Sequence, residues 1–141
     1  MLDFSRYFLP GHQAFLEYAN FETVSPTPGA HKMACKDTIV ARLSEPAGVK
    51  FTFNRSVSFE PEGLFCLSVT FSCFLRFREE TRGELDWHTI DIAGEFRSGG
   101  GVILHELSSR ASLLISEITS AAGQMPLITS AGTSQKRDPN Q

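Results

Sequence analysis

The sequence predicts an α+β domain, in which a four-stranded antiparallel sheet is followed by one long C-terminal helix packed on the sheet. Two patterns support this prediction. Residues 49–77 alternate apolar and polar side chains with one short interruption, which is typical of the two strands of a hairpin. Residues 103–122 instead repeat apolar side chains at three- and four-residue steps, which is typical of a helix lying on a sheet.

The N-terminal part of the chain has weaker patterns. Residues 1–11 end at a Pro-Gly pair and suit either a short helix or an irregular arm. Residues 16–24 alternate in part and lead into a proline-rich turn, which predicts a first strand, with a helix over residues 13–20 as the alternative. Residues 38–43 have strand propensity and form a short apolar segment.

The hairpin over residues 49–77 has the clearest pattern in the sequence. Its apolar residues occupy odd positions: Val49, Phe51, Phe53, Val57, Phe59, Phe65, Leu67, Val69, Phe71, Cys73, Leu75 and Phe77. Residues 60–63, Glu-Pro-Glu-Gly, suit the connecting turn because proline fixes φ and glycine permits unusual backbone angles. The apolar face of this hairpin must be covered by a helix, by a second copy of the chain or by a ligand.

A further strand is predicted over residues 85–96, after a charged turn at residues 78–84. Its even positions carry His88, Ile90, Ile92 and Phe96. Because the connecting loops are short, an antiparallel meander is expected. Residues 98–101, Ser-Gly-Gly-Gly, lack the Lys-Ser/Thr of a phosphate-binding loop, so we expect them to end the sheet as a flexible hinge.

The helix is expected to end at Gly123, with Pro126 close behind. Its apolar stripe is Ile103, Leu107, Ala111, Leu114, Ile115, Ile118 and Ala122. Its other face carries small hydroxyl side chains that allow close approach to another surface: Ser108, Ser109, Ser112, Ser116 and Ser120. Residues 130–141 are polar, so we expect one domain over residues 1–129 and a disordered tail after it.

Composition limits the class of protein. The chain has 141 residues and a net charge of −3, which suits one domain and argues against nucleic acid as a partner. No apolar run is long enough to span a membrane, and the first residues lack the pattern of a secretion signal. The three cysteines lack C-x-x-C spacing and indicate reduced thiols in the cytoplasm, with Cys66 and Cys73 on opposite faces of one strand. The 12 phenylalanines suit either a β core or a surface that accepts varied apolar segments.

The sequence contains no catalytic pattern. His31 and Cys35 are four residues apart, but no second pair at zinc spacing follows them. Asp86, Asp91 and Glu95 are explained by an exposed strand face as well as by catalysis. We therefore expect no enzyme activity, no bound metal and no cofactor.

The helix and the segment after it carry a resemblance to a known family. The segment runs from Arg110-Ala111 through Ile115-Ser116-Glu117-Ile118 to Gly123-Gln124-Met125-Pro126-Leu127-Ile128. It resembles the main helix and the proline turn of the SecB and SecB-like protein-export chaperones. Residues 49–59 and 64–77 look like the second and third strands of that family. The likeness covers residues 16–129 and consists of hydrophobic patterns.

This resemblance implies an ATP-independent cytoplasmic chaperone that holds unfolded or nascent polypeptides in apolar surface grooves. It also implies a homotetramer, a dimer of dimers, with the sheets outside and the helices between the dimers. On this basis the expected client-binding residues are Phe15, Tyr18, Phe21, Phe65, Phe74 and Trp87. The residues expected to pack on the sheet and at the contact between copies are Ile103, Leu107, Leu114 and Ile118.

The chain departs from the export members of the family after the proline turn. Those members carry a second helix and an acidic tail, whereas here a short polar segment containing Lys136-Arg137 follows. Two further partners therefore stay open: the export motor SecA, and an antitoxin or another specific client of the kind that SecB-like relatives guard.

Two other classes of function also stay open. The first is a small β-rich ligand-binding or enzyme domain whose inward face encloses a pocket. The second is a structural subunit of a larger assembly, which would have one defined partner. The mass in solution discriminates the chaperone from the small domain, because the chaperone requires a tetramer or at least a dimer.

Overall fold

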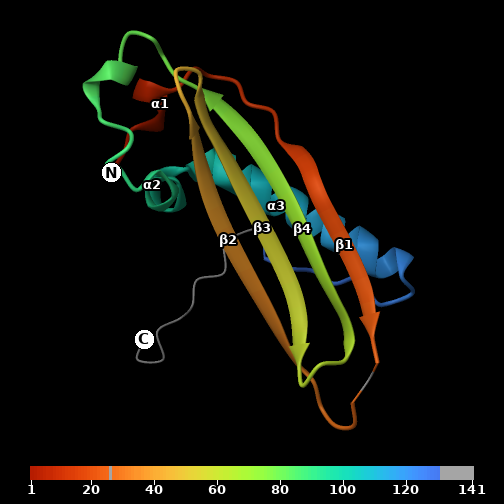
Figure 1. Ribbon diagram of the computed structural model, residues 1–141. Coiled ribbons are helices and arrows are strands. Elements are labelled where there is room, and N and C mark those ends of the chain that lie inside the picture. The colour runs from red at the N-terminus through yellow and green to blue at the C-terminus, as the bar shows by residue number, and fades with distance from the viewer. Residues whose placement is uncertain (26, 131–141) are drawn as a thin grey trace.

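The computed structural model describes residues 1–25 and 27–130. Four strands form one antiparallel sheet in the order β1-β4-β3-β2: β1 Phe15–Val24, β2 Lys32–Ser44, β3 Gly48–Glu60 and β4 Leu64–Arg76 (Figure 1). The long helix α3, Gly101–Ala121, lies across one face of the sheet (Figure 1). The shorter helices are α1 Phe4–Tyr7, the 3-10 helix η1 Arg82–Glu84 and α2 Ile92–Gly99. The predicted α+β class is confirmed.

The predicted hairpin forms as β3 and β4. These strands pair without interruption from Gly48 opposite Arg76 to Val57 opposite Leu67. β2 pairs with β3 along its full 13 residues and is much longer than the segment 38–43 predicted from propensity. β1 pairs with β4, so the strand predicted at 16–24 is confirmed and the helix alternative is wrong.

The face of the sheet that contacts α3, here called the inner face, holds the core. Odd-numbered residues of β3 and β4 lie there in the alternation that the sequence predicts, and these are buried: Val49, Phe51, Phe53, Val57, Leu67, Val69, Cys73 and Leu75. From α3 come the buried residues Leu104, Leu107, Ala111 and Ile115. Removal of this apolar surface from water is the main favourable term in folding.

The strand predicted over residues 85–96 is wrong. The second part of this segment belongs to α2, which begins after Asp91, whose carboxylate accepts a hydrogen bond from the Gly94 amide at 3.1 Å. Ile92 and Phe96 are both buried. Because a spacing of four residues fits one face of a helix as well as one face of a strand, the alternation could not distinguish the two structures.

The glycine-rich segment at residues 98–101 does not end the sheet but joins α2 to α3. A Cβ atom on Gly100 would lie 2.8 Å from the Phe96 ring, so only glycine fits this close turn. Gly101 begins α3 with φ +46°, in the left-handed region that glycine adopts at little cost. The segment is a tight corner between two helices, and the predicted hinge at the end of the sheet is wrong.

The N-terminal residues cover the end of the sheet. α1 begins after Asp3, whose carboxylate accepts hydrogen bonds from the backbone amides of Ser5 and Arg6. Phe8 then pairs with Phe77 beyond the end of β4, and their rings stack at 5.3 Å. The short-helix alternative for this region is therefore correct.

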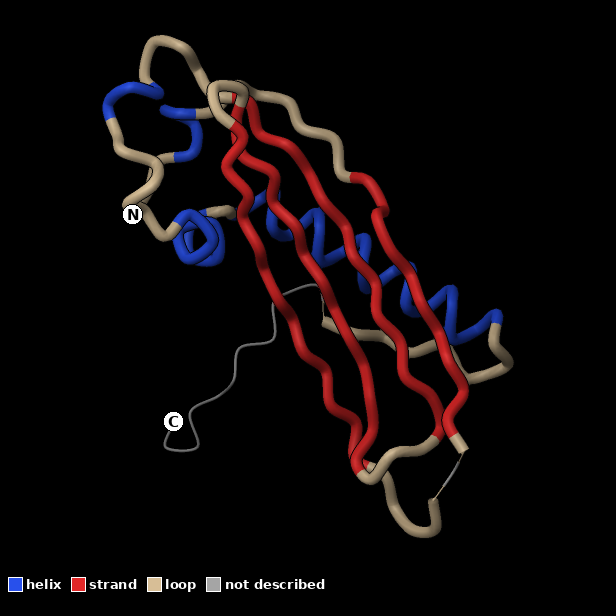
Figure 2. Tube along the Cα trace, in the orientation of Figure 1, coloured by secondary structure: helices blue, strands red, loops and turns tan. Residues whose placement is uncertain are grey.

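The chain after α3 folds back along that helix (Figure 2). The helix ends as predicted, with Gly123 at φ +80°. The Leu127 amide donates a hydrogen bond to the Thr119 hydroxyl at 2.9 Å, and the Ser112 hydroxyl donates to the Thr129 carbonyl at 2.6 Å. Hydroxyl side chains of α3 thus hold the chain's own exit segment. The predicted tail continues past Ser130 into residues 131–141, outside the described part of the chain.

One ion pair interrupts the apolar inner face. Arg55 of β3 lies directly opposite Asp37 of β2, and two hydrogen bonds of 2.8 and 2.9 Å join the guanidinium to the carboxylate. The third nitrogen, Nη1, donates to the Thr129 hydroxyl at 3.1 Å and to the Ser130 carbonyl. Both charged side chains are fully buried, so their desolvation is offset by this set of hydrogen bonds.

Candidate functional site

The opposite face of the sheet, here called the outer face, is covered by none of the described helices (Figure 2). Even-numbered residues of β2, β3 and β4 share this face, because the register places Arg42 opposite Lys50 and Lys50 opposite Phe74. The centre of the outer face is a band of small polar side chains: Thr52, Asn54, Ser56, Ser68, Thr70 and Ser72. The Asn54 amide donates to the hydroxyls of Ser68 and Thr70, each at 2.8 Å. These cross-strand hydrogen bonds fix the floor of the face.

Three aromatic side chains lie on the outer face, from Phe74 near one end of β4 to Tyr18, whose register partner Thr70 is at the middle of that strand. The register of β1 against β4 shifts between Leu16 and Tyr18, which is a β-bulge and brings Phe15 and Tyr18 to the same side. These residues are 42% and 51% exposed. Phe74, which is half-buried, lies two residues along β4 from Ser72, the register partner of Phe15. We call Phe15, Tyr18 and Phe74 the aromatic patch.

A hollow of about 420 Å³ lies beside the aromatic patch. Its lining is Gly11, His12, Gln13, Phe15, Phe74 and Arg76. It therefore combines two aromatic side chains with a guanidinium group and with the backbone of the segment that enters β1. A hollow of this size can accept one or two apolar side chains of a bound segment.

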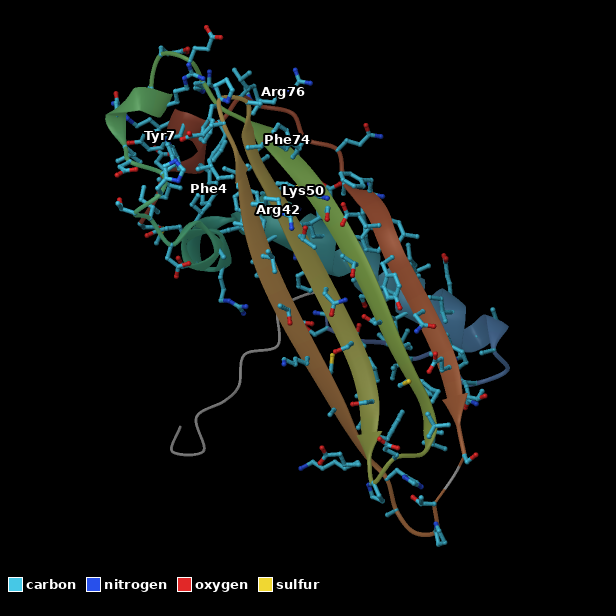
Figure 3. All side chains as sticks on the ribbon, viewed as in Figure 1. Phe4, Tyr7, Arg42, Lys50, Phe74 and Arg76 are labelled. Atoms are coloured by element: carbon cyan, nitrogen blue, oxygen red, sulfur yellow. The ribbon has the colours of Figure 1, made fainter. Side chains whose placement is uncertain are left out.

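Charged side chains border the aromatic patch (Figure 3). Lys50 forms an ion pair with Glu17 of the bulge, and its ammonium lies 5.8 Å from the centre of the Phe15 ring. The hydrogen bond from Lys50 lowers the pKa of the Glu17 carboxyl, although partial burial opposes this shift. Arg42 and Arg76 are exposed on the same face.

Three of the six predicted client-binding residues, the aromatic patch, come together on the outer face, and the other three lie elsewhere. Phe21 and Phe65 stack at 5.3 Å on the inner face, at the far end of the sheet, where Phe65 is only 6% exposed. Trp87 is 5% exposed and packs against Tyr7, Phe8 and Phe77. Phe65 is a core residue because its odd position in β4 turns it to the inner face. Trp87 is a core residue because the N-terminal residues Tyr7 and Phe8 pack on it.

The four residues predicted for the contact between copies share one flank of α3. Leu107 is fully buried against the sheet, while Ile103, Leu114 and Ile118 are partly buried at the edge of the core. The side of α3 that faces away from the sheet also carries apolar groups. Val102 is 80% exposed and Leu113 is 61% exposed. Ser109, Ser116 and Ser120 share this side through the 3.6-residue period.

Sequence reasoning missed two groups of charged residues. Arg55 occupies an odd position within the apolar series of β3, and such a charge predicts a buried partner. The partner Asp37 could not be found without the register of β2. Arg42 and Arg76 were also missed, because they belong to strands far apart in sequence and meet only through the order β2-β3-β4.

Within residues 1–25 and 27–130, no group of three or more His, Cys, Asp or Glu side chains could hold a metal ion. Cys66 and Cys73 are free thiols, and burial raises the pKa of Cys73 to about 12. Cys66 lies on the outer face and Cys73 on the inner face, as the alternation predicts. None of the described helices is long and apolar enough to cross a membrane.

Comparison with known proteins identifies the fold. No protein-family model matches the sequence, and no curated protein matches it. Among solved structures, the chain is similar to the SecB-like chaperone of Mycobacterium tuberculosis in complex with a ChAD peptide from the HigA1 antitoxin. The TM-score is 0.63 with 8% sequence identity, and the match covers 84% of this chain and 89% of that chain. The chain therefore has the fold of SecB-like chaperones.

Proposed function

We propose that this protein is an ATP-independent holdase chaperone, which binds unfolded or nascent polypeptides on the outer face of its sheet. One observation carries the proposal: α3 covers the inner face alone, and the outer face keeps Phe15 and Tyr18 exposed, with Phe15 lining a hollow. The SecB-like fold supports it, since the similar chaperone was solved with a bound peptide. The client-binding residues in this proposal are the aromatic patch.

The chemistry of the outer face suits reversible binding of varied segments. Apolar contact is non-directional, so an aromatic surface can accept different apolar side chains without a fixed hydrogen-bond pattern. Burying one such side chain contributes about 1.5–3 kcal/mol before the entropic cost of ordering the client. A patch of three aromatic residues therefore favours weak, releasable binding, with no need for ATP hydrolysis.

We propose that copies of the chain associate through α3 as a dimer of dimers. The exposed Val102 and Leu113 support this, because they are two apolar side chains on the side of α3 away from the sheet. The small serine side chains beside them allow another backbone to approach closely. The partly buried Ile103, Leu114 and Ile118 would complete the contact, with Leu107 holding α3 on the sheet.

The partners in this proposal are unfolded clients in the cytoplasm, where cysteine side chains stay reduced. Residues 1–129 would act as one unit. Two kinds of client fit: a wide set of export proteins passed on to the motor SecA, or one specific client such as an antitoxin. The SecB-like chaperone with the antitoxin peptide makes the specific client the better-supported choice.

The test combines multi-angle light scattering with an aggregation assay. The purified chain should have the mass of a tetramer, and without ATP it should suppress aggregation of a chemically unfolded protein. The double variant Tyr18→Ser/Phe74→Ser should lose most of this suppression while keeping its mass. Met125→Ser, which removes an exposed apolar side chain far from the outer face, is the matched control. A monomer without suppression would overturn the proposal.

A further inference from the structure

Three cations lie near Phe74 on the outer face, with Arg76 on one side of it and Lys50 and then Arg42 on the other (Figure 3). Arg42 of β2 lies opposite Lys50 of β3, and Lys50 lies opposite Phe74 of β4. Arg76 follows two residues along β4 and lines the hollow together with Phe74. We call Arg42, Lys50 and Arg76 the basic cluster.

The arrangement of the basic cluster costs stability. Like charges directly opposite each other on neighbouring strands repel, and Arg42 opposite Lys50 is such a pair. Glu17 pairs with Lys50 and is also within electrostatic reach of Arg42, while neither Arg42 nor Arg76 forms an ion pair within residues 1–25 and 27–130. The cluster is therefore a local excess of positive charge on a chain whose net charge is −3.

Protection of a sheet edge does not explain the cluster. Basic residues on edge strands block unwanted pairing, and Arg42 lies on the edge strand β2. Lys50 and Arg76 belong to the central strands β3 and β4, which need no such protection. A surface that keeps cations beside an exposed aromatic group suits an anionic partner with an apolar anchor.

We infer that the basic cluster and the aromatic patch together select clients that carry an apolar side chain flanked by carboxylates. This inference rests on the proposed function and adds to it the chemical class of the client. The apolar side chain would enter the hollow between Phe15 and Phe74, where Arg76 meets a neighbouring carboxylate. Arg42 would meet a second carboxylate on the other side of Phe74.

The spacing of the two arginines fits an extended acidic segment. With strands about 4.8 Å apart and a rise of about 3.4 Å per residue, the Cα atoms of Arg42 and Arg76 lie about 12 Å apart. Carboxylates about three to four residues apart on an extended chain would therefore reach both guanidinium groups. The charge pattern disfavours the chain's own C-terminal residues 131–141, which contain Lys136, Arg137 and one acid, Asp138.

The experiment is fluorescence anisotropy of the full chain with two fluorescein-labelled peptides. The acidic peptide is Ser-Glu-Glu-Phe-Leu-Gly-Glu-Glu-Ser, and the basic peptide has lysine in place of each glutamate. The acidic peptide should bind at least about tenfold more tightly, and added salt should reduce this difference. The double variant Arg42→Glu/Arg76→Glu should reverse the preference. Lys36→Glu, an exposed cation farther along β2 on the same face, should change it by less than about twofold.

Four results would overturn the inference, and they differ in what they say of the proposed function. Equal binding of both peptides would reject charge selection and leave the apolar client site intact. Absence of binding by either peptide would reject the site itself. Acidic preference that survives Arg42→Glu/Arg76→Glu would place the selection elsewhere. Tighter binding of a single-stranded oligonucleotide than of the acidic peptide would replace the peptide with a nucleic acid as partner.

Discussion

The two faces of this sheet are built from the same strands and have opposite chemistry. On the inner face of β3, Phe51 and Phe53 are fully buried, and the one charged residue, Arg55, has its partners within the chain. On the outer face of the same strand, Thr52 and Asn54 form a polar floor, and Lys50 contacts the aromatic patch. The centre of the inner face is covered within one chain, with Leu16 and Met33 exposed on the edge strands, whereas the outer face exposes both apolar and cationic groups.

This difference shows that alternation alone does not assign a function to a face. Period-two patterning tells which residues share a face, but burial depends on what packs against that face. The inner face is core because α3 and the exit segment cover it. The outer face departs from a plain solvated surface at the end where the bulge in β1 adds Phe15 and Tyr18.

The largest expected difference between the faces is in thiol reactivity. Cys66 lies on the outer face, whereas Cys73 is fully buried on the inner face with its pKa raised to about 12. At pH 8 about one Cys73 side chain in ten thousand would be ionised, and the thiolate is the reactive form. Alkylation of the native protein, followed by mass spectrometry of peptides, should modify Cys66 long before Cys73. Equal rates would mean that the register of β4 is wrong.

The next largest effect should come from the buried ion pair. Asp37→Ala would leave the Arg55 guanidinium buried without its carboxylate and should lower the free energy of unfolding by about 3–5 kcal/mol. Urea denaturation followed by circular dichroism measures this change. The double replacement Asp37→Leu/Arg55→Met should recover much of the loss, because it removes both charges. A loss below about 1 kcal/mol for Asp37→Ala would show that the pair is hydrated.

Phenylalanines on the two faces should respond differently to truncation. Phe51→Ala should cost about 3–5 kcal/mol of stability because it opens a cavity in the core. Phe74→Ser should change the melting temperature little while weakening client binding. Thermal unfolding and the anisotropy assay, run on both variants, separate these effects. A large loss of stability in Phe74→Ser would make Phe74 a core residue.

The smallest effects concern acid stability. Hydrogen bonding to His12 is the main cause of the lowered pKa of Glu106 on α3, and hydrogen bonding to Lys50 plays this role for Glu17 on the outer face. A lowered folded-state pKa stabilises the protein above the ordinary value of 4.5, and this contribution is lost as the pH falls below that value. Glu106→Gln and Glu17→Gln should each reduce the difference in the free energy of unfolding between pH 7 and pH 3 by less than about 1 kcal/mol. Urea denaturation at pH 7 and pH 3 measures this difference. If both variants keep the same difference as the unmodified protein, the lowered pKa values of Glu106 and Glu17 would be contradicted.

The sequence predicted the parts of the fold that rest on a single period. The hairpin β3–β4 and the helix α3 each repeat one pattern over many residues. A pattern of that length rarely arises by chance in a segment with another secondary structure. Residues 85–96 failed because Ile92 and Phe96 satisfy both periods. β2 was predicted too short, since its pattern is broken by residues such as Asp37, whose burial depends on Arg55.

The candidate site could be predicted only in part, for a related reason. Phe74 stood out because it interrupts a polar face, and the structure places it at the same hollow as Phe15, with Tyr18 farther along the same face. Trp87 and Phe65 could not be assigned correctly from sequence, since their burial comes from residues distant in the chain. The basic cluster depends on strand order, and no local pattern encodes it.

Photo-crosslinking tests most directly the claim that the outer face binds clients. We would place p-benzoylphenylalanine at position 74 on the outer face and, in a separate sample, at position 113 on the exposed side of α3. Each sample is mixed with a chemically unfolded client and irradiated. The photo-reactive group in place of Phe74 should crosslink to the client. The same group in place of Leu113 should crosslink two copies of the chain. Client adducts at position 113 with none at position 74 would contradict the account.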